Sequence, residues 1–404
     1  MGVKGNAIFA QSGGPTAVIN SSICGAIQEA RKHEEITAMY GSINGILGVL
    51  GENMIDLNRE SRRNIELLRQ TPSSALGSSR HKLKEEDYDR ILDVLTAHNI
   101  RYFFIAGGND SMDTADKVFR MAREKHYELY VMGLPKTVDN DLPLTDHCPG
   151  YGSVARWLAV SVRDAGLDTE AIYTSDTIKI VETMGRNTGW ITAATALARQ
   201  EEDDAPHIIL LPEVPFNREN FLSAVERVYR KRGYALITCC EGLKEEGGGY
   251  LTASQRSLDT DTFGHKQLGG VGELLCGMIA EGLKIKARAD KPGTIQRVSS
   301  VLASPVDAEE AYISGAQAVR HAVEGKSGCM VTLEREAGEK YVCRTGIVSL
   351  AEVANKEKKV PREFINEEGN GVSRKFLEYV TPLIGGPLPE YTRLERHFVG
   401  KRLA

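Results

Sequence analysis

Short apolar segments with the character of β-strands alternate along this chain with longer segments of helical periodicity. NAIFAQ precedes a helix predicted at residues 16–31, and RYFFIAGG precedes one predicted at 111–124. IKIVETMG and HIILLPE precede helices predicted at 188–199 and 218–232, and YALITCCEG closes the second of these units. This alternation favours parallel sheets with helices on both faces. Several of the strands end in glycine-rich turns, at the sheet edge where open α/β folds bind their ligands.

The composition limits which partners the protein can bind and in which cellular compartment it can act. The chain has 404 residues, 41% hydrophobic and 26% charged, which is enough for two or three domains with buried cores. Its net charge of −5 gives no general attraction to nucleic acid or to a membrane surface, so we expect neither partner. No segment approaches the roughly 18 apolar residues of a spanning helix. Seven cysteines without a CxxC pair are typical of reduced thiols, and we predict a cytoplasmic protein.

The first candidate site follows the first predicted strand, in AQSGGPTAVINSSICGAI (residues 10–27). Gly13 and Gly14 have no side chains, so an anion can approach the backbone N–H groups, and the helix that follows would direct its positive end to the same place. The pattern is not the GxxxxGK[ST] phosphate loop, and glycines between a strand and a helix are often plain tight turns. Phosphate binding and a simple turn are both consistent with these residues.

In the second candidate, IAGGNDSMDTA (residues 105–115), Asn109, Asp110 and Ser111 follow two glycines at the predicted start of a helix. Asp and Ser are favourable N-caps, so capping is one interpretation. A carboxylate that faces bound phosphates would also hold Mg²⁺, which prefers a few oxygen ligands and retains water. Asn109 and Asp110 are therefore the candidate metal ligands.

The third candidate, GLPKTVDND (residues 133–141), places a lysine and two carboxylates directly after an apolar segment. In an extended chain Asp139 and Asp141 point to the same side, because side-chain direction repeats every two residues. Two carboxylates that face one cleft suit a general base beside an acid that organises a metal. Lys136 would neutralise a nearby anion.

The fourth candidate is VETMGRNTGW (residues 181–190), in which a strand ends at a glycine turn that presents Arg186. A guanidinium group can bind a phosphate through two parallel hydrogen bonds. An ordinary surface arginine is the alternative. A later segment, NKEKKVPREFINEEGNG (residues 355–371), is rich in Lys and Glu, and we predict a solvated surface without a chemical role there.

Taken in order, these motifs resemble those of the phosphofructokinase family, which has an SGG turn, a GGD turn, a TIDND segment and an MGR turn. Further on, CCEGL and TIQRV also match family positions. The resemblance covers about residues 5–320. The matching positions are Gly13 and Gly14, GGNDS (107–111), TVDND (137–141), MGR (184–186), Glu241 and Arg297.

The resemblance implies an α/β fold of two Rossmann-like three-layer αβα domains, with the active site in the cleft between them. It also implies that the chain crosses between the domains more than once. We expect residues 1–150 with about 300–345 to form the phosphoryl-donor domain. Residues 151–299 with about 346–404 would form the sugar-phosphate domain.

The resemblance also implies roles for particular residues, with Asp139 removing the proton from the 1-hydroxyl of fructose 6-phosphate. Asp110, Lys136 and Arg186 complete the expected catalytic set, and Mg²⁺ is expected at Asn109 and Asp110. The residues expected to bind fructose 6-phosphate are Thr137, Val138, Asp139, Asp141, Met184, Gly185, Arg186, Glu241 and Arg297. The phosphoryl donor is expected over Gly13, Gly14, Arg80, Gly108 and Lys136.

Two positions distinguish the phosphoryl donors within the family. Members that use ATP have a glycine directly after GGD and another directly before TIDND, which leave room for the α-phosphate of the nucleotide. This chain has Asp110 and Lys136 at these positions. A carboxylate there would repel and block the α-phosphate, and the lysine would replace missing contacts to pyrophosphate. The resemblance therefore implies pyrophosphate as the donor. Separately, we expect a homodimer or a homotetramer.

Three departures from the family pattern concern the metal and the sugar pocket. Asn109 replaces an acidic residue that usually reaches Mg²⁺, and a neutral amide binds this ion more weakly. Thr177 stands where bacterial ATP enzymes often offer an arginine from a neighbouring subunit, and TIQRVSSVLASP lacks the usual glycine pair after QR.

Two other functions are consistent with the same cleft. An ATP-dependent sugar-phosphate kinase would share almost every motif, and the distinguishing residues are Asp110 and Lys136. A sensor that binds a sugar phosphate without catalysis is the second alternative. A sensor would need neither the pair Asp139 and Asp141 nor a donor site.

Overall fold

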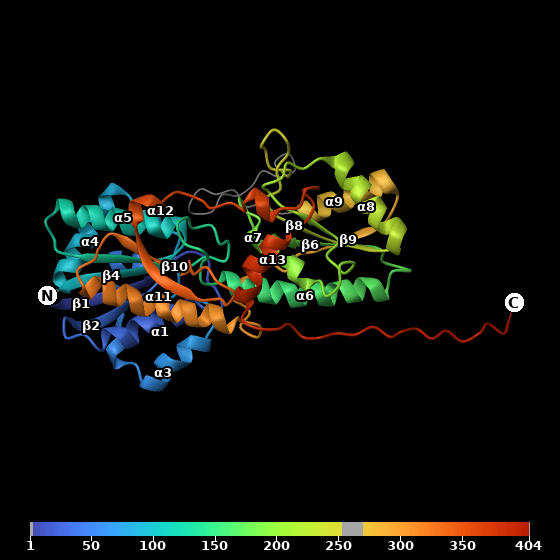
Figure 1. Cartoon of the computed structure of the whole chain (residues 1–404). Helices are drawn as coiled ribbons and strands as arrows, with labels where there is room; N and C mark the ends of the chain where they lie inside the picture. Colours follow the sequence, from blue (N-terminus) through green and yellow to red (C-terminus); the bar gives the residue numbers. More distant parts are fainter. Residues whose placement is uncertain (1–2, 253–269, 404) are drawn as a thin grey trace.

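The computed structural model describes residues 3–252 and 270–403. Within these residues, two α/β domains lie side by side, each built on its own sheet (Figure 1). The first sheet has the order β11-β10-β5-β4-β1-β2-β3, and the second has the order β7-β8-β6-β9. The strands are β1 Gly5–Gln11, β2 Ile36–Ser42, β3 Met54–Asp56, β4 Ile100–Gly107, β5 Tyr130–Pro135, β6 Ile178–Thr183, β7 Ile208–Leu210, β8 Ala235–Cys240, β9 Ala287–Asp290, β10 Cys329–Arg335 and β11 Cys343–Ser349.

Helices cover both faces of the first sheet. On β4, Phe103 and Ile105 belong to the core shared with α4 and α5, whereas Tyr102 and Phe104 belong to the core shared with α1 and α11. This alternation is the two-residue period of a strand. The predicted three-layer αβα arrangement is confirmed for this domain. Its helices are α1 Ile19–Ala30, α2 Ile46–Leu50, α3 Arg62–Leu67, α4 Glu85–Ala97, α5 Asn109–Glu124, α11 Pro305–Val323 and α12 Leu350–Val353.

The prediction of parallel sheets is correct for the interior of the first sheet and wrong at its edges. β3 pairs antiparallel with β2, and β11 pairs antiparallel with β10. The connection from Arg335 at the end of β10 to Cys343 at the start of β11 is short. A parallel pair needs a crossover of roughly a dozen or more residues, so β11 must return antiparallel.

The second sheet is parallel at every described pairing. One face packs against α8 and α9, and the other packs against α6. The helix predicted at 218–232 is confirmed as α8, and the one predicted at 188–199 is α7 followed by a 3₁₀ turn, Thr195–Ala198. The helices of this domain are α6 Tyr151–Ala171, α7 Trp190–Ala194, α8 Arg218–Arg232, α9 Val271–Leu283, α10 Ile295–Val298 and α13 Arg374–Val380.

The chain passes between the domains three times among the described residues. It leaves the first sheet before α6, returns with α11, and leaves again after α12. The expected last crossing at about residue 346 would fall inside β11, which pairs with β10 along all of Cys343–Ser349. α12 also packs into the core of the first domain. We therefore propose that the first domain extends to Val353 and that the second resumes after it.

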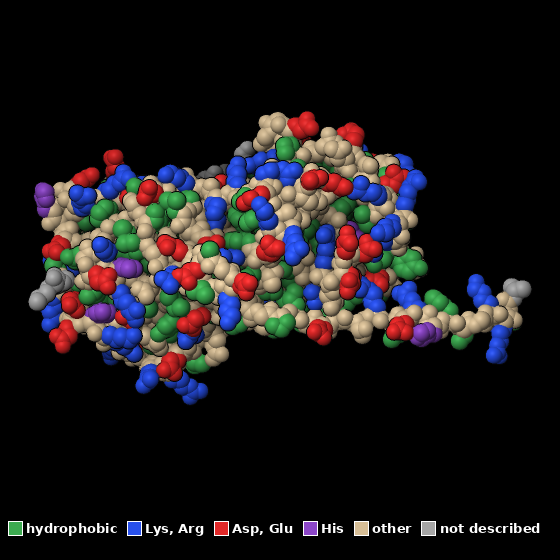
Figure 2. Space-filling view, viewed as in Figure 1, with side chains coloured by type: hydrophobic (Ala, Val, Ile, Leu, Met, Phe, Trp, Pro, Cys, Tyr) green, Lys and Arg blue, Asp and Glu red, His purple; other side chains and the backbone are tan. Residues whose placement is uncertain are grey.

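Charged side chains of both signs are interspersed over the face seen in Figure 2. The cysteines at all seven positions are free thiols. Among the described residues, no helix is long and apolar enough to cross a membrane.

Candidate active site

A cavity of about 470 Å³ lies between the two domains. The four sequence motifs meet in it, and among the residues predicted for the site only Gly185 lies outside its lining. The lining residues are Gly13, Gly14, Arg80, Gly108, Asn109, Asp110, Ser111, Lys136, Thr137, Val138, Asp139, Asp141, Met184, Arg186, Asn187, Thr188, Glu241, Arg297, Asn355 and Glu357.

The order of the first sheet explains why three distant motifs meet. β5, β4 and β1 are neighbouring parallel strands, so their carboxyl ends share one edge of the sheet. Gly13 follows β1, Gly108 follows β4 and Lys136 follows β5. Gly107, the last residue of β4, leaves no room for a side chain, because a Cβ atom there would lie 1.9 Å from Ser111 Oγ.

The first glycine turn brings the two domains into contact. A Cβ atom on Gly14 would lie 2.8 Å from Nη1 of Arg297, which α10 of the second domain supplies. The Lys136 side chain is buried, and its Nζ donates a 2.7 Å hydrogen bond to the carbonyl oxygen of Gly14. The turn predicted to hold the phosphoryl donor is therefore bordered by two cationic side chains.

The helix N-terminus at this cleft belongs to α5 and not to α1. α1 begins at Ile19 and contributes no residue to the cavity, whereas α5 begins at Asn109, directly after Gly108. The capping interpretation is wrong, because Gly108 is the N-cap and no side chain caps this helix. Asn109 and Asp110 stand in the first turn of α5, where the unsatisfied N–H groups favour anions.

The segment that carries the two aspartates is not extended. The backbone turns at Asp139, and Asn140 has a φ of 53°. The argument from a two-residue period is therefore wrong, although both Asp139 and Asp141 line the cavity. The side chain of Asn140 fixes this turn, because Nδ2 donates to Tyr379 Oη at 2.9 Å and Oδ1 accepts from the backbone N–H of Cys148 at 3.0 Å.

The backbone of Asp139 is held from both domains. Its N–H donates to Thr137 Oγ1 at 3.1 Å, and its carbonyl oxygen accepts from Thr188 Oγ1 at 3.2 Å. Thr188 belongs to the turn between β6 and α7 in the second domain. The contacts of this backbone therefore do not depend on the carboxylate.

The second domain supplies its residues from the ends of β6 and β8. Met184 and Arg186 follow β6, and Glu241 follows β8. Gly185 has a φ of 136°, a conformation that L-residues rarely adopt, and it shapes the turn without lining the cavity. The Met184 N–H donates to Gln296 Oε1 at 3.1 Å, which ties this turn to α10, the helix that carries Arg297.

Burial and neighbouring charges shift the proton affinities of the central groups. Burial, reinforced by Arg297, lowers the pKa of Lys136 to about 7. Burial, reinforced by Asp139, raises the pKa of Asp141 to about 7. Burial raises the pKa of Asp139 as well, with Arg186 opposing it. A carboxylate whose proton affinity is raised is suited to act as a base near neutral pH.

Sequence reasoning missed five lining residues. Ser111, Asn187 and Thr188 lie within the recognised motifs, although no individual role was predicted for them. Asn355 and Glu357 belong to the segment predicted to be a solvated surface; both residues are exposed, as predicted, and they also line the cavity. Asn187 Nδ2 donates to Glu357 Oε1 at 2.7 Å, a contact that joins the MGR turn to the chain after α12.

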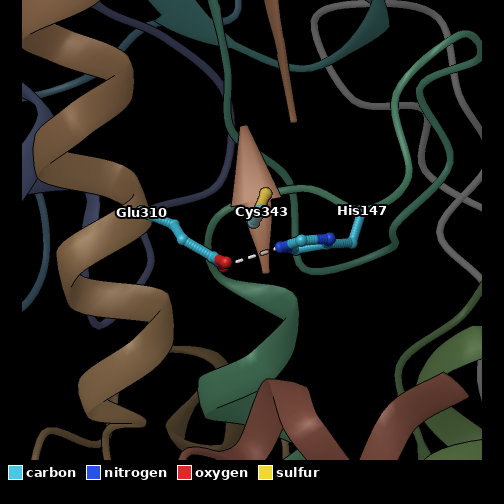
Figure 3. Close-up of side chains that lie close together, drawn as sticks. All are labelled: His147, Glu310 and Cys343. Carbon is cyan, nitrogen blue, oxygen red and sulfur yellow. Dashed lines mark hydrogen bonds and ion pairs between the residues drawn. The ribbon is translucent and has the colours of Figure 1, made fainter. Parts of the chain in front are cut away.

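A second group of side chains with metal-ligand chemistry lies outside the cavity. His147, Glu310 and Cys343 present ligand atoms within 4.8 Å of one another (Figure 3). The two ring nitrogens of His147 contact Glu310 Oε2 at 2.7 Å and Asp146 Oδ2 at 2.8 Å, and Tyr341 donates to the other oxygen of Glu310. Burial lowers the pKa of His147, but hydrogen bonds to these two carboxylates outweigh burial and raise it. We interpret the group as a buried ion-pair network and not as a metal site.

The cleft offers cations for a polyanion on one side and, next to them, a carboxylate of raised proton affinity. These are the requirements for moving a phosphoryl group to a hydroxyl group, because that reaction depends on alignment and charge neutralisation. The fold and the site thus define a phosphotransferase with two α/β domains. The family model described as Phosphofructokinase matches residues 6–322, which is most of the chain. The chain belongs to the phosphofructokinase family.

Individual relatives extend this similarity over the full length. A Halomonas elongata protein named pyrophosphate–fructose 6-phosphate 1-phosphotransferase is 43% identical and covers 98% of both chains. The crystal structure of a pyrophosphate-dependent phosphofructokinase from Nitrosospira multiformis has a TM-score of 0.87 at 40% identity, covering 99% of this chain and 98% of that one. An ATP-dependent 6-phosphofructokinase of Amycolatopsis methanolica is 31% identical over 65% of this chain and 56% of its own.

Proposed function

We propose that this protein transfers a phosphoryl group reversibly from pyrophosphate to the 1-hydroxyl of fructose 6-phosphate, which gives fructose 1,6-bisphosphate and phosphate. One observation carries the choice of donor: Asp110 and Lys136 both line the cleft, at the positions where the family's ATP-using members keep open space. The full-length relatives named for pyrophosphate support it. We propose that the enzyme acts in the cytoplasm, which its free cysteines support.

The test is an assay of the purified protein with fructose 6-phosphate and either pyrophosphate or ATP, run in both directions. We expect turnover with pyrophosphate, and fructose 6-phosphate formation from fructose 1,6-bisphosphate and phosphate. Turnover with ATP alone would favour the sugar-phosphate kinase alternative. Binding of fructose 6-phosphate without turnover would favour the sensor.

In the mechanism that we propose, the first domain holds the donor and the second holds the sugar phosphate. The 6-phosphate lies near Arg186 and Arg297, and Asp139 accepts the proton from the 1-hydroxyl. Lys136 and Arg80 neutralise charge on the donor and on the transferred group, and the backbone N–H groups at Gly13, Gly14 and the start of α5 add fixed dipoles. The chain thus aligns two substrates and moves one proton.

The residues beside Asp139 fit a divalent cation. Asn109 Nδ2 donates to Asp141 Oδ2 at 3.0 Å, so the two side chains touch. Within the described part of the chain, Asn109 Oδ1 and Asp141 Oδ1 are buried and have no hydrogen-bond partner. Hard oxygen donors of this kind suit Mg²⁺, which when bound would neutralise charge on the phosphates. We propose Mg²⁺ at Asn109 and Asp110, as the sequence suggests, with Asp141 as an added ligand.

We expect Asn109→Asp to lower the Mg²⁺ concentration at half-maximal activity without changing the donor. The substitution exchanges a neutral oxygen for a charged one and sets two carboxylates against each other, a pair that a divalent cation stabilises. The measurement is a Mg²⁺ titration of kcat for wild type and variant, with pyrophosphate and with ATP. An unchanged titration would mean that residue 109 does not face the ion.

We also propose that the protein is a homo-oligomer, and the C-terminal tail supports this. Arg163 Nη1 donates to the Pro389 carbonyl at 2.7 Å, and Arg393 pairs with Glu170 at 2.8 Å, so the tail is attached up to about Arg393. Beyond that point it extends away from the body (Figure 1). Large apolar side chains on it are almost fully exposed, namely Leu394 at 87%, Phe398 at 88%, Val399 at 91% and Leu403 at 90%.

Removing residues 394–404 is expected to lower the number of subunits in the assembly in solution. Exposed apolar side chains that gather on one segment can mark an interaction surface, and a second copy would cover them in a symmetric exchange. The measurement is light scattering of the native and shortened chains at equal concentration, with Phe398→Asp as a full-length counterpart. A multimer of unchanged mass in both variants would show that the tail does not hold the assembly.

A further inference from the structure

Residues 354–360, here named the crossing segment, carry the chain from one domain core to the other. Before it, Leu350 and Val353 are buried in the first domain, and Val360 at its end is buried in the second. Asn355 Nδ2 donates to Asp113 Oδ1 on α5 at 2.9 Å. The Val360 N–H donates to Glu213 Oε1 at 3.0 Å, so both ends of the segment are fixed.

Lys358, in the middle of the crossing segment, contacts both ends of the loop that follows the proposed base. Its backbone N–H donates to the Asp141 carbonyl at 2.6 Å. Its Nζ donates to the carbonyl oxygens of Thr145 at 3.0 Å and Asp146 at 2.8 Å. One residue thus ties down the loop 141–146 at its first residue and at its last two.

Trp190 of α7 holds Lys358 in place from the second domain. Trp190 Nε1 donates to the Lys358 carbonyl at 2.9 Å, and the Lys358 Nζ lies 5.2 Å from the centre of the indole ring. That distance is within the range of a cation–π contact. The loop carbonyls and the indole ring therefore fix the position of the ammonium group and stabilise its charge.

We propose that Lys358 is a positioning residue for phosphoryl transfer, which holds the loop 141–146 so that Asp139 and Asp141 face the substrates bound in the cleft. The inference rests on the proposed function. Lys358 does not line the cavity and is not expected to touch a substrate. Its effect should therefore appear in the rate of the chemical step more than in the binding of either substrate.

The test uses the full-length chain with Lys358→Met, which keeps most of the length of the side chain and the backbone N–H but removes the three ammonium donors. We expect kcat to fall by roughly 10- to 100-fold, because a displacement of about 1 Å of catalytic groups has effects of this size. The KM values for fructose 6-phosphate and pyrophosphate should change by less than about threefold. Lys358→Arg restores donors to the two carbonyl oxygens and should regain part of the lost kcat.

Lys359→Met is the matched control, because Lys359 is the next residue, is exposed, and lies outside the cavity lining. It should keep the wild-type kcat. Hydrogen exchange at backbone amides 139–148 is measured in parallel, and Lys358→Met should accelerate it while the melting temperature stays within a few degrees of wild type. A purely structural role would instead lower the melting temperature and the active fraction, with an unchanged kcat per folded molecule, and would overturn the proposal.

The two proposals fail in different ways. If the wild type does not react with pyrophosphate and fructose 6-phosphate, the proposed function has failed, and hydrogen exchange alone then decides whether Lys358 holds the loop. If the wild type reacts and Lys358→Met equals Lys359→Met in kcat, the positioning role is wrong and the proposed function stands.

Discussion

Replacing Asp139 with asparagine is expected to lower kcat by about 100- to 10,000-fold, the usual contribution of a general base. The amide keeps the shape of the side chain but cannot accept the proton of the 1-hydroxyl. The fold should persist, because the hydrogen bonds of residue 139 to Thr137 and Thr188 use its backbone. Fructose 6-phosphate should bind at least as tightly as to wild type, since one negative charge leaves a cleft that binds anions. The measurements are kcat in both directions and calorimetric binding of the sugar phosphate.

A control variant tests whether a fall in kcat reflects the missing base or only the loss of a negative charge. Asp93→Asn removes a carboxylate from the exposed face of α4, outside the cavity lining, and should leave kcat unchanged. An Asp139→Asn variant that turns over at the wild-type rate, with its fold confirmed by circular dichroism, would show that another group accepts the proton.

The architecture could be predicted because strand-like segments alternate with helical periodicity, and several strands, such as β1, β4 and β6, end close to glycine turns. Those signals predicted α8 at its observed bounds and placed α5 within two residues of its start. They did not predict the antiparallel edges, since the direction of β11 depends on the length of the connection after β10 and not on its own composition. Strand order, which brings β5, β4 and β1 together, is likewise a tertiary property.

The sequence predicted those site residues that lie at or shortly after the ends of strands. Lys136, Asp139 and Arg186 follow strands directly, so short motifs mark them. The extended-chain argument failed because Asn140 adopts a left-handed conformation that its contacts to Tyr379 and Cys148 stabilise. The Asn and Asp residues of this segment favour a turn, but the contact to Tyr379 that helps to fix its conformation is tertiary.

The crossing segment escaped prediction for a related reason. Glu357 and Lys358 lie in a run of alternating charges, and such runs are mostly solvated. Glu357 reaches the cleft through the last passage of the chain between the domains, more than 160 residues after its contact Asn187 beside the MGR turn. Only the folded chain contains that information.

The largest change in specificity is expected from the two residues that distinguish the donors. Asp110 stands in the first turn of α5 and Lys136 is buried with its Nζ against the Gly14 carbonyl, and both line the cleft. Two like charges about 4 Å apart repel by about 4 kcal/mol at an effective dielectric constant of about 20, so a carboxylate beside the α-phosphate of ATP would exclude it strongly. Lys136 supplies positive charge to pyrophosphate that ATP would not need there. Charge and size thus act in the same direction.

We therefore expect Asp110→Gly to raise ATP turnover from undetectable to measurable, and Lys136→Gly to damage chiefly the pyrophosphate reaction. Asp110→Asn removes the charge but keeps the size, so comparison with Asp110→Gly separates the two causes. The glycine variant should remain folded, because losing an acidic first-turn residue costs about 0.3–1 kcal/mol and a helical glycine about 1 kcal/mol. ATP activity should stay weak, since the adenine ring also needs a groove that this change does not create. The measurement is kcat/KM for both donors in wild type, in each single variant and in the pair, and efficient use of ATP by the wild type would refute the explanation at once.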